Sequence, residues 1–315
     1  YKGAKNYRYS FFLWAEYKNT KQLVTVLITG GTGMVGQLLN EKLSSKGFLV
    51  RVLTRHPKKE NEYAWDITSN YIDEKAFQNL DYIIHLAGAG IADKRWTPKR
   101  KQEIIDSRTK STELLFDTIK KLNIQLKWCI SASAVGYYGA ITSDKIFTEN
   151  DKPANDFLGK VFQLWEQPVL AFDTINIPTT IFRIGIVLSK KGGALEKMIT
   201  PMITPIASGK QYVPWIHIDD LTNMFVFAIE KNQPGIFNAV APEEQTSHSF
   251  SKLLAKKTKR IFLPLGVPKF MLQLIFREMS IILTEGSRVS SKKIENTHFK
   301  FTYRNLENAF DNIFN

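Results

Sequence analysis

The chain has 315 residues, of which 43% are hydrophobic and 12% aromatic, so a disordered composition is excluded and one large domain or two smaller ones are expected. The single cysteine, Cys129, excludes an internal disulfide framework and is typical of a reducing compartment. Because it lies in the apolar run 127–130, we expect a buried core thiol. The spacing of the five histidines is not that of metal ligands. The sequence contains no run of about 18 apolar residues, so we expect no membrane-spanning helix.

The net charge of +13 is compatible with binding to nucleic acid or to an anionic membrane. It is equally compatible with a solvated basic surface and a phosphate-rich ligand. Basic residues are dispersed along the chain, and the densest cluster, 94–101, is short. We therefore expect a small-molecule substrate, with neither nucleic acid nor a membrane as partner.

Residues 1–21 are rich in Tyr, Phe, Lys and Asn and differ from the rest of the chain. Their apolar run, 11–15, is too short for the core of a signal peptide. We interpret this segment as an extension outside the fold, and we expect a cytoplasmic protein. The aromatic residues leave contact of the extension with a membrane or a partner open.

The first strong motif is a buried strand at 24–29, followed by glycines and then by a helical pattern. Gly30 allows a sharp turn, Gly33 allows a pyrophosphate to approach the backbone, and Gly36 allows the helix to lie close to the sheet. The N-terminus of the helix offers free N–H groups and its positive dipole end to phosphates. This order predicts a dinucleotide site. Its contacts are expected from the loop and the first helical turn: Gly30, Thr32, Gly33, Met34, Val35 and Gly36.

A second strand, 48–54, is followed by Arg55, Lys58 and Lys59. The residue at the end of this strand normally meets the adenosine ribose. An acid there favours NAD, whereas an arginine binds the 2′-phosphate of NADP. No acid is present, so the sequence predicts NADP; the alternative is that these are solvated loop charges.

The remaining pattern alternates strands with helices, which predicts an α/β fold with a Rossmann, doubly wound parallel sheet. Strands are expected at 62–65, 81–87, 126–131, 179–185 and 235–240, and helices at 73–80, 99–122, 155–173 and after 215–221, the last with Asp219 as N-cap. Ligands of such a sheet bind at the carboxyl ends of its strands. Two of these ends supply further expected cofactor contacts: Asp66 near the adenine, and Leu86, Ala87 and Gly88 beside the cofactor.

We assign residues 22–190 to the nucleotide-binding domain, with 215–240 returning to it. The segments 191–214 and 241–315 are assigned to a smaller α+β C-terminal substrate domain. The first of these segments is rich in Pro, Gly and Thr, which is typical of a lid or substrate region.

Together, these motifs resemble the atypical extended short-chain dehydrogenase/reductases of the nucleoside-diphosphate-sugar epimerase-like family, with a C-terminal domain of unknown function. The resemblance rests on 28–36, 85–96, 107–108, 131–139, 183–189, 192–194 and 215–220, and covers about residues 23–312. It implies a Rossmann NADP domain and a sugar-nucleotide or carbonyl substrate. It also implies cofactor contacts from Ser107, Ser131 and Arg183. Some extended members form homodimers through two helices.

Typical members reduce or oxidise a carbinol with a Ser, a Tyr and a Lys four residues after the Tyr. Ser133 matches the serine, but Leu158 and Phe162 occupy the other two places. One interpretation is an NADP-dependent oxidoreductase or epimerase-like enzyme in which Tyr137 or Tyr138 donates the proton and Lys160 replaces the lysine. The alternative is a sensor or scaffold that binds NADP and does little chemistry, or a nucleic-acid-associated binding protein.

Other basic side chains are candidates for holding an anionic substrate: Arg95, Arg108, Arg183 and His217. Each candidate also has a structural interpretation. Tyr137 and Tyr138 are equally typical of core aromatics, Lys160 of a solvated helix face, and His217 of packing at the head of its helix.

Overall fold

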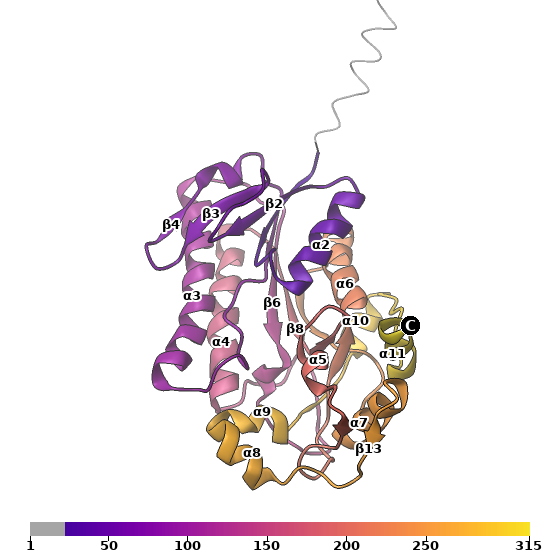
Figure 1. Cartoon of the computed structure of the whole chain (residues 1–315). Helices are drawn as coiled ribbons and strands as arrows, with labels where there is room; N and C mark the ends of the chain where they lie inside the picture. Colours follow the sequence, from indigo (N-terminus) through magenta and orange to yellow (C-terminus); the bar gives the residue numbers. More distant parts are fainter. Residues whose placement is uncertain (1–22) are drawn as a thin grey trace, which may run out of the picture.

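The computed structural model describes residues 23–315, and the predicted extension at 1–21 lies outside the described residues (Figure 1). Eight strands form the central sheet: β1 (Thr25–Thr29), β2 (Leu49–Thr54), β3 (Glu62–Asp66), β4 (Tyr71–Ile72), β5 (Tyr82–His85), β6 (Trp128–Ala134), β8 (Thr179–Ile184) and β12 (Gly235–Ala239). Their order is β12-β8-β6-β5-β1-β2-β3-β4, and all neighbours are parallel except β3 and β4.

The chain runs from β1 outward to the edge strand β4 and then crosses to β5 on the other side of β1. This reversal is the topological switch point of a doubly wound sheet, beside which such folds bind ligands. The predicted fold class is therefore confirmed. Strands β1 and β5 are entirely buried, which explains their nearly continuous apolar sequences.

Four long helices cover the sheet. Figure 1 shows α3 (Pro98–Lys121) and α4 (Phe157–Leu170) on one side, and α2 (Met34–Ser45) and α6 (Ile218–Lys231) on the other. Helix α3 begins at the N-cap Thr97, whose hydroxyl accepts from Arg100 N, with Pro98 at the first helical position. A short 3-10 segment, η3 (Ala171–Ile175), extends α4.

Two local predictions are wrong. The expected helix at 73–80 is only one 3-10 turn, η1 (Glu74–Phe77), because the preceding residues pair with β3 as β4 and Asp73 caps the turn. The N-cap of α6 is His217 and not Asp219: the ring of His217 accepts from Asp219 N. The short strand β11 (Trp215–His217) pairs with β9 (Ile186–Leu188) and brings that ring to the start of the helix.

The remaining elements are shorter than the four long helices. They are η2 (Val135–Tyr138), β7 (Ile146–Phe147), α5 (Ala194–Met198), β10 (Met202–Ile203), α7 (Ser247–Lys257), β13 (Ile261–Phe262), α8 (Lys269–Phe276), η4 (Arg277–Ser280), α9 (Ile281–Thr284), β14 (Arg288–Val289), α10 (Lys292–Asn296) and α11 (Leu306–Phe314). Many of them share a second hydrophobic cluster that includes Trp215, Phe250 and Phe310.

The single cysteine lies in the core, as predicted. Cys129 on β6 is 1% exposed, and its burial raises the pKa of the thiol to about 12. A thiol that stays protonated and inaccessible is a packing group. Among the described helices, none combines the length and the apolar character needed to cross a bilayer.

Candidate functional site

The glycine loop lies between β1 and α2, beside the switch point. Gly30 has φ of +69°, and a Cβ there would come within 3.0 Å of the backbone of Leu86 and Ala87. A Cβ on Gly36 would collide with the backbone of Gly30 and Gly31. Gly36 therefore lets α2 pack against the turn itself, whereas the sequence argument placed this close contact at the sheet.

Gly33 has a different role, because its surroundings are less crowded than those of Gly36. A Cβ there would meet only the carbonyl oxygen of Gly30 at 3.3 Å, and its φ of −77° and ψ of 170° suit any residue. Gly33 is also the N-cap of α2, which has neither a side-chain cap nor an acidic residue in its first turn, where Met34 and Val35 lie. A small residue in front of uncapped N–H groups suits the close approach of a phosphate. Thr32 beside it is exposed.

Two buried polar residues, Thr29 and His85, support the loop that follows β5. Thr29 Oγ1 accepts from the N–H groups of Leu86 and Ala87, at 3.2 Å each, and lies 2.7 Å from His85 Nδ1. Burial, together with the charge of Arg108, lowers the pKa of His85 to about 3, so the ring is neutral. Leu86 and Ala87 are half-buried against Gly30 at this edge.

Helix α3 fixes the same loop from its other side. Ala89 N donates to Ser107 Oγ at 2.9 Å, and Arg108 Nη1 donates to the carbonyl of Ala89 at 2.9 Å. A Cβ on Gly88 would come within 3.0 Å of the Arg108 guanidinium. Arg100 Nη2 donates to the carbonyl of Gly90. Ser107 thus holds the loop, and Gly88 remains exposed at the edge.

Arg108 is a buried cation. Its side chain is 6% exposed, and its guanidinium carbon lies 4.8 Å from the ring centroid of Trp165. Burial and the neighbouring Arg100 lower its pKa to about 10. Within residues 23–315 it forms no salt bridge, and its Nε has no hydrogen-bond partner. Arg108 therefore supports the loop after β5 and is not open to solvent as a free anion-binding group.

The expected ribose end of the site is exposed. Arg55 follows β2 directly, and Lys58 and Lys59 lie in the same exposed turn. Asp66 at the end of β3 accepts from Thr68 N, Thr68 Oγ1 and Ser69 Oγ at 2.7–3.0 Å, and these bonds lower the pKa of its carboxyl. Asp66 thus shapes its own turn. In the turn after β2, Glu62 accepts from Lys58 N at 2.7 Å, and within residues 23–315 the side chains of Arg55, Lys58 and Lys59 form no salt bridge.

At the ends of β6 and β8, the predicted catalytic serine belongs to a buried polar network. Ser133 Oγ donates to Glu166 Oε1 at 2.6 Å. Arg183 binds the same carboxylate through Nε and Nη2, at 2.9 and 2.8 Å. All three residues are less than 5% exposed. Ser131, fully buried on β6, donates to the carbonyl of Ala132.

The network continues through one of the two tyrosines. Arg183 Nη1 donates to Tyr138 OH at 3.0 Å, and Tyr138 OH donates to Asn238 Oδ1 at 2.6 Å. Tyr138 is fully buried, and burial raises its pKa despite Arg183. Tyr137 is only half-buried, and the Arg183 guanidinium carbon lies 3.4 Å from its ring centroid. Of the two, only Tyr137 retains a partly accessible ring.

The positions of the missing Tyr and Lys are apolar and buried on α4. Leu158 is 7% exposed and Phe162 is 2% exposed, and Phe162 packs against Gly136 of η2. Lys160, offered as a replacement lysine, is exposed on the same helix. Residues 158 and 162 therefore close the region that a Tyr–Lys pair would occupy in a typical member.

The four proposed anion-binding residues are not gathered in one place. Arg108 and Arg183 are buried in separate networks, whereas Arg95 is exposed in the loop before α3. His217 caps α6 and its ring lies 3.8 Å from that of Tyr303. The structural interpretation of His217 fits this placement.

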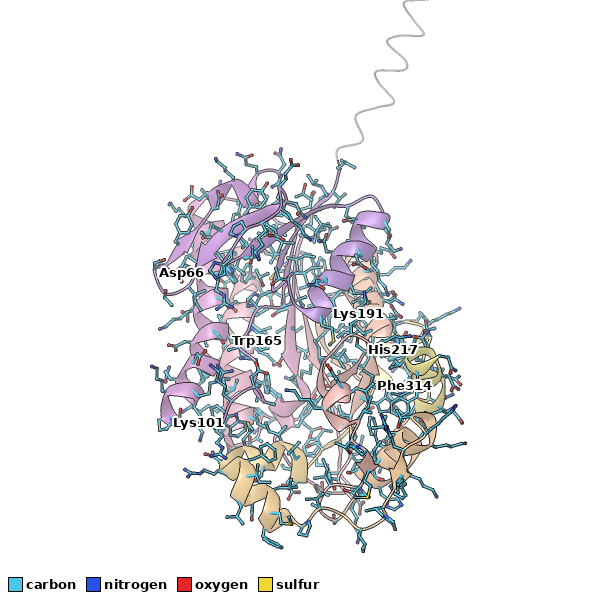
Figure 2. All side chains as sticks on the ribbon, in the orientation of Figure 1. Asp66, Lys101, Trp165, Lys191, His217 and Phe314 are labelled. Carbon is cyan, nitrogen blue, oxygen red and sulfur yellow. The ribbon has the colours of Figure 1, made fainter. Side chains whose placement is uncertain are left out.

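The sequence argument missed one feature of the site, Glu166, the carboxylate that engages both Ser133 and Arg183. It did single out most of the loop 190–193 as part of a lid or substrate region, and the structure adds that a Cβ on Gly193 would lie 3.3 Å from Met34 at the start of α2. This loop carries the exposed Lys191, which Figure 2 shows near α2. The Gly192–Gly193 pair, with φ of +83° and +88°, was the available signal.

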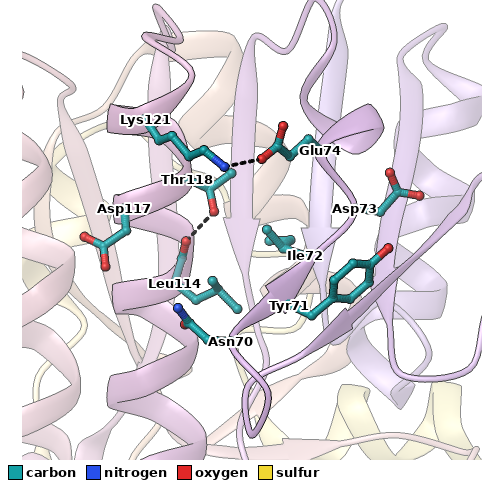
Figure 3. Close-up of a pocket in the computed structure, with 9 residues that line it drawn as sticks. All are labelled: Asn70, Tyr71, Ile72, Asp73, Glu74, Leu114, Asp117, Thr118 and Lys121. Atoms are coloured by element: carbon teal, nitrogen blue, oxygen red, sulfur yellow. Dashed lines mark hydrogen bonds and ion pairs between the residues drawn. The ribbon is translucent and has the colours of Figure 1, made fainter.

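A surface cavity of about 570 Å³ lies elsewhere, between β4 and the second half of α3 (Figure 3). Its lining residues are Asn70, Tyr71, Ile72, Asp73, Glu74, Leu114, Asp117, Thr118 and Lys121. Glu74 and Lys121 form an ion pair across it at 2.7 Å. None of the predicted cofactor or catalytic residues lines this cavity, so it is separate from the candidate site.

The parallel sheet, its switch point and the glycine loop define the Rossmann class of nicotinamide dinucleotide-binding folds. The chain belongs to the NAD dependent epimerase/dehydratase family, whose model matches residues 26–239. A second model, a domain of unknown function (DUF1731), matches residues 267–313. The predicted family is thereby confirmed.

Individual proteins agree with this assignment. Epimerase family protein SAR0825 of Staphylococcus aureus is 35% identical over 297 residues, which cover 91% of this chain and 98% of the relative. The crystal structure of human epimerase family protein SDR39U1 (isoform 2) with NADPH is 28% identical, with a TM-score of 0.81, and covers 92% of this chain and 99% of that one. UDP-glucuronic acid 4-epimerase of Bacillus cereus, at 17% identity, TM-score 0.73 and coverage of 91% and 97%, shows the fold alone.

Proposed function

We propose that the chain binds NADP(H) and acts as an oxidoreductase or epimerase-like enzyme on a small carbonyl or sugar-nucleotide substrate, with a non-standard active site. The observation that carries this proposal is the uncapped N-terminus of α2 behind Gly33, with basic residues and no acid at the end of β2. A related human protein has been crystallised with NADPH, which supports the same cofactor here.

The residues present fit a dinucleotide. The first turn of α2 would hold the pyrophosphate, and Arg55 with Lys58 or Lys59 would hold a 2′-phosphate. The loop after β5 would lie along the cofactor. A bound nicotinamide supplies or accepts a hydride; the protein must then supply or accept the proton.

For that proton, the geometry favours Tyr137 over the other candidates. The Ser133 hydroxyl already donates its hydrogen bond to Glu166, and Tyr138 is enclosed between Arg183 and Asn238. Burial raises the pKa of Tyr137, and no lysine follows it to lower that value. Tyr137 therefore keeps its proton at neutral pH, which suits a general acid in reduction better than a base in oxidation.

The cofactor part is tested by titrating NADPH and NADH into the wild-type protein, Arg55→Glu and a control, Lys120→Glu. Lys120 is exposed on α3, so the control makes the same change of charge away from the loop. We expect Arg55→Glu alone to lose its preference for NADPH. Equal affinity of all three proteins for NADPH would contradict the assignment of Arg55.

The chemical part is tested by screening carbonyl compounds and sugar nucleotides for oxidation of NADPH. We expect Tyr137→Phe to lower turnover about 100-fold or more, because a general acid contributes this much. Control variants that keep NADPH binding, such as Lys160→Gln, should retain activity. Full activity of Tyr137→Phe would exclude this role.

A second candidate function is an NADP(H)-binding sensor or scaffold. The observation that favours it is the apolar, buried pair Leu158 and Phe162 where a proton-transfer pair would stand. It predicts tight NADPH binding without turnover of any compound in the screen. In that case NADPH should still raise the melting temperature, because ligand that binds only the folded state stabilises it.

A further inference from the structure

One end of the molecule exposes an apolar surface that the proposed function does not use. Its residues come from β10, β13, the loop after β13 and α8, and we call it the 261–275 face. They are Met202, Ile261, Leu263, Leu265, Phe270, Met271, Leu274 and Ile275. Leu265 is 83% exposed and Leu274 is 75% exposed. Exposed apolar residues gathered in this way mark an interaction surface in soluble proteins.

The face is continuous in the fold. Strands β10 and β13 pair, which sets Met202 beside Ile261, and Leu263 N donates to the carbonyl of Ile203. The chain then passes through the exposed loop 263–265 into α8, in which only Leu272 is buried. Figure 1 shows this stretch running along one end of the molecule, from β13 beside α7 to α8.

The sequence that forms most of the face is basic, and the acidic residues that follow it, Glu278 and Glu285, form ion pairs with Lys101 and Lys269. From residue 245 to residue 277 the sequence contains no Asp or Glu and seven basic residues: Lys252, Lys256, Lys257, Lys259, Arg260, Lys269 and Arg277. Lys259 and Arg260 precede β13, and Lys269 and Arg277 flank α8; all four are exposed. Of these four, only Lys269 forms a salt bridge within the described residues, with Glu285.

This combination disfavours a second copy of the chain as the occupant. A two-fold interface would place the same surface on both sides, so the basic residues of one copy would face those of the other. It also disfavours RNA, because nucleic-acid bases stack on aromatic rings and the face is mainly aliphatic. Aliphatic side chains interleaved with lysine and arginine match the interface of an anionic bilayer.

We propose that the 261–275 face docks on an anionic lipid surface. The loop 263–265 and α8 would enter the headgroup region, and the flanking basic residues would bind phosphate groups. An ion pair between Glu278, which follows α8, and Lys101, near the start of α3, connects this end of the face to the helices that cover the sheet. Figure 1 shows β6 pointing toward the end where α8 and α9 lie, so docking would bring the carboxyl edge of the sheet toward the lipid.

The test is co-sedimentation of the full chain with vesicles of phosphatidylcholine alone and of an equimolar mixture with phosphatidylglycerol. We expect binding to the mixed vesicles only. The variant Leu265→Gln/Leu274→Gln removes two exposed leucines and should weaken this binding about tenfold or more. Its control, Tyr71→Gln/Leu170→Gln, changes two exposed apolar residues elsewhere and should bind as the wild type does.

The charge contribution has its own variant. Lys259→Gln/Arg260→Gln should weaken binding to the mixed vesicles by about tenfold or more, because each basic residue near such a surface contributes on the order of 1 kcal/mol. Phe270→Trp with brominated lipids, compared with the wild type and its six tryptophans, reports insertion, since quenching of the added fluorescence requires contact with the acyl chains. We expect quenching in mixed vesicles.

Four results would overturn the proposal. The first is equal binding to neutral and anionic vesicles. The second is vesicle binding that the leucine variant retains, which would assign it to another segment. The third is a wild-type dimer that the leucine variant converts to a monomer without any vesicle binding. The fourth is release from the vesicles by RNA together with an RNA complex that the leucine variant also loses.

Discussion

Two groups of residues at the carboxyl edge of the sheet differ in whether their polar groups are free to bind a ligand. In the glycine loop, the first turn of α2 has no side-chain cap, and Gly33 leaves space in front of it. At the ends of β6 and β8, Ser133, Glu166 and Arg183 are bonded to one another and buried. The first group is arranged to receive a ligand, whereas the second is already satisfied within the protein.

The buried network should show the largest effect on stability. Glu166→Gln leaves the charge of Arg183 buried with a neutral partner, and we expect a loss of about 3–5 kcal/mol in the free energy of unfolding. Denaturant unfolding measures this loss. The control Glu230→Gln breaks an exposed ion pair with Lys46 and should cost no more than about 1 kcal/mol. An equal loss in the free energy of unfolding for Glu166→Gln and Glu230→Gln would contradict the view that the buried network stabilises the fold.

Two variants of the glycine loop should change different properties: one lowers the free energy of unfolding, and the other weakens NADPH binding. Gly36→Ala forces a Cβ against the backbone of Gly30 and Gly31 and should cost about 1–3 kcal/mol in the free energy of unfolding. Gly33→Ala keeps an ordinary backbone conformation and brings its methyl group against a single atom, the carbonyl oxygen of Gly30 at 3.3 Å, so its melting temperature should change much less than that of Gly36→Ala. It should nevertheless weaken NADPH binding about tenfold or more, equivalent to about 1.4 kcal/mol. Unchanged NADPH affinity in Gly33→Ala would contradict the ligand-receiving role of the loop.

Buried His85, which supports the loop after β5, predicts that the free energy of unfolding depends on pH. The pKa of His85 is lowered to about 3 in the folded protein, against 6.5 ordinarily. The neutral ring therefore contributes stability that is complete above pH 6.5 and is lost as the pH falls toward 3. In this range the unfolding free energy of wild type should fall more steeply than that of His85→Gln, by up to about 1.4 kcal/mol per pH unit. His56→Gln, at an exposed histidine, should follow the wild type; parallel curves for wild type and His85→Gln would refute the prediction.

The sheet and the glycine loop could be predicted from the sequence because their signals are local. Apolar runs define β1 and β5, and Gly30 and Gly36 mark positions where a Cβ would come too close to neighbouring backbone. Local signals failed where a distant contact decides the outcome. His217 displaces Asp219 as the cap of α6 because β11 pairs with β9, a contact that the sequence pattern near residue 217 does not contain.

The hydrogen-bond partners of the catalytic candidates could not be predicted from the sequence for the same reason. Ser133 and Glu166 are 33 positions apart in the chain and meet only after α4 packs on β6. The family resemblance could identify Ser133, but not the carboxylate that accepts its hydrogen bond. The position of Arg55 could be predicted because it depends only on the end of β2, whereas its role in binding stays a prediction. Local backbone features were therefore predictable, and contacts between distant side chains were not.

The central claim is that the glycine loop and Arg55 together form an NADP(H) site. The most direct test is calorimetric titration of the wild-type protein with NADPH and with NADH under identical conditions. The account predicts one NADPH bound per chain, with an affinity clearly higher than that for NADH. Absence of binding by either nucleotide to the folded protein would contradict it, and a preference for NADH would contradict the part that rests on Arg55.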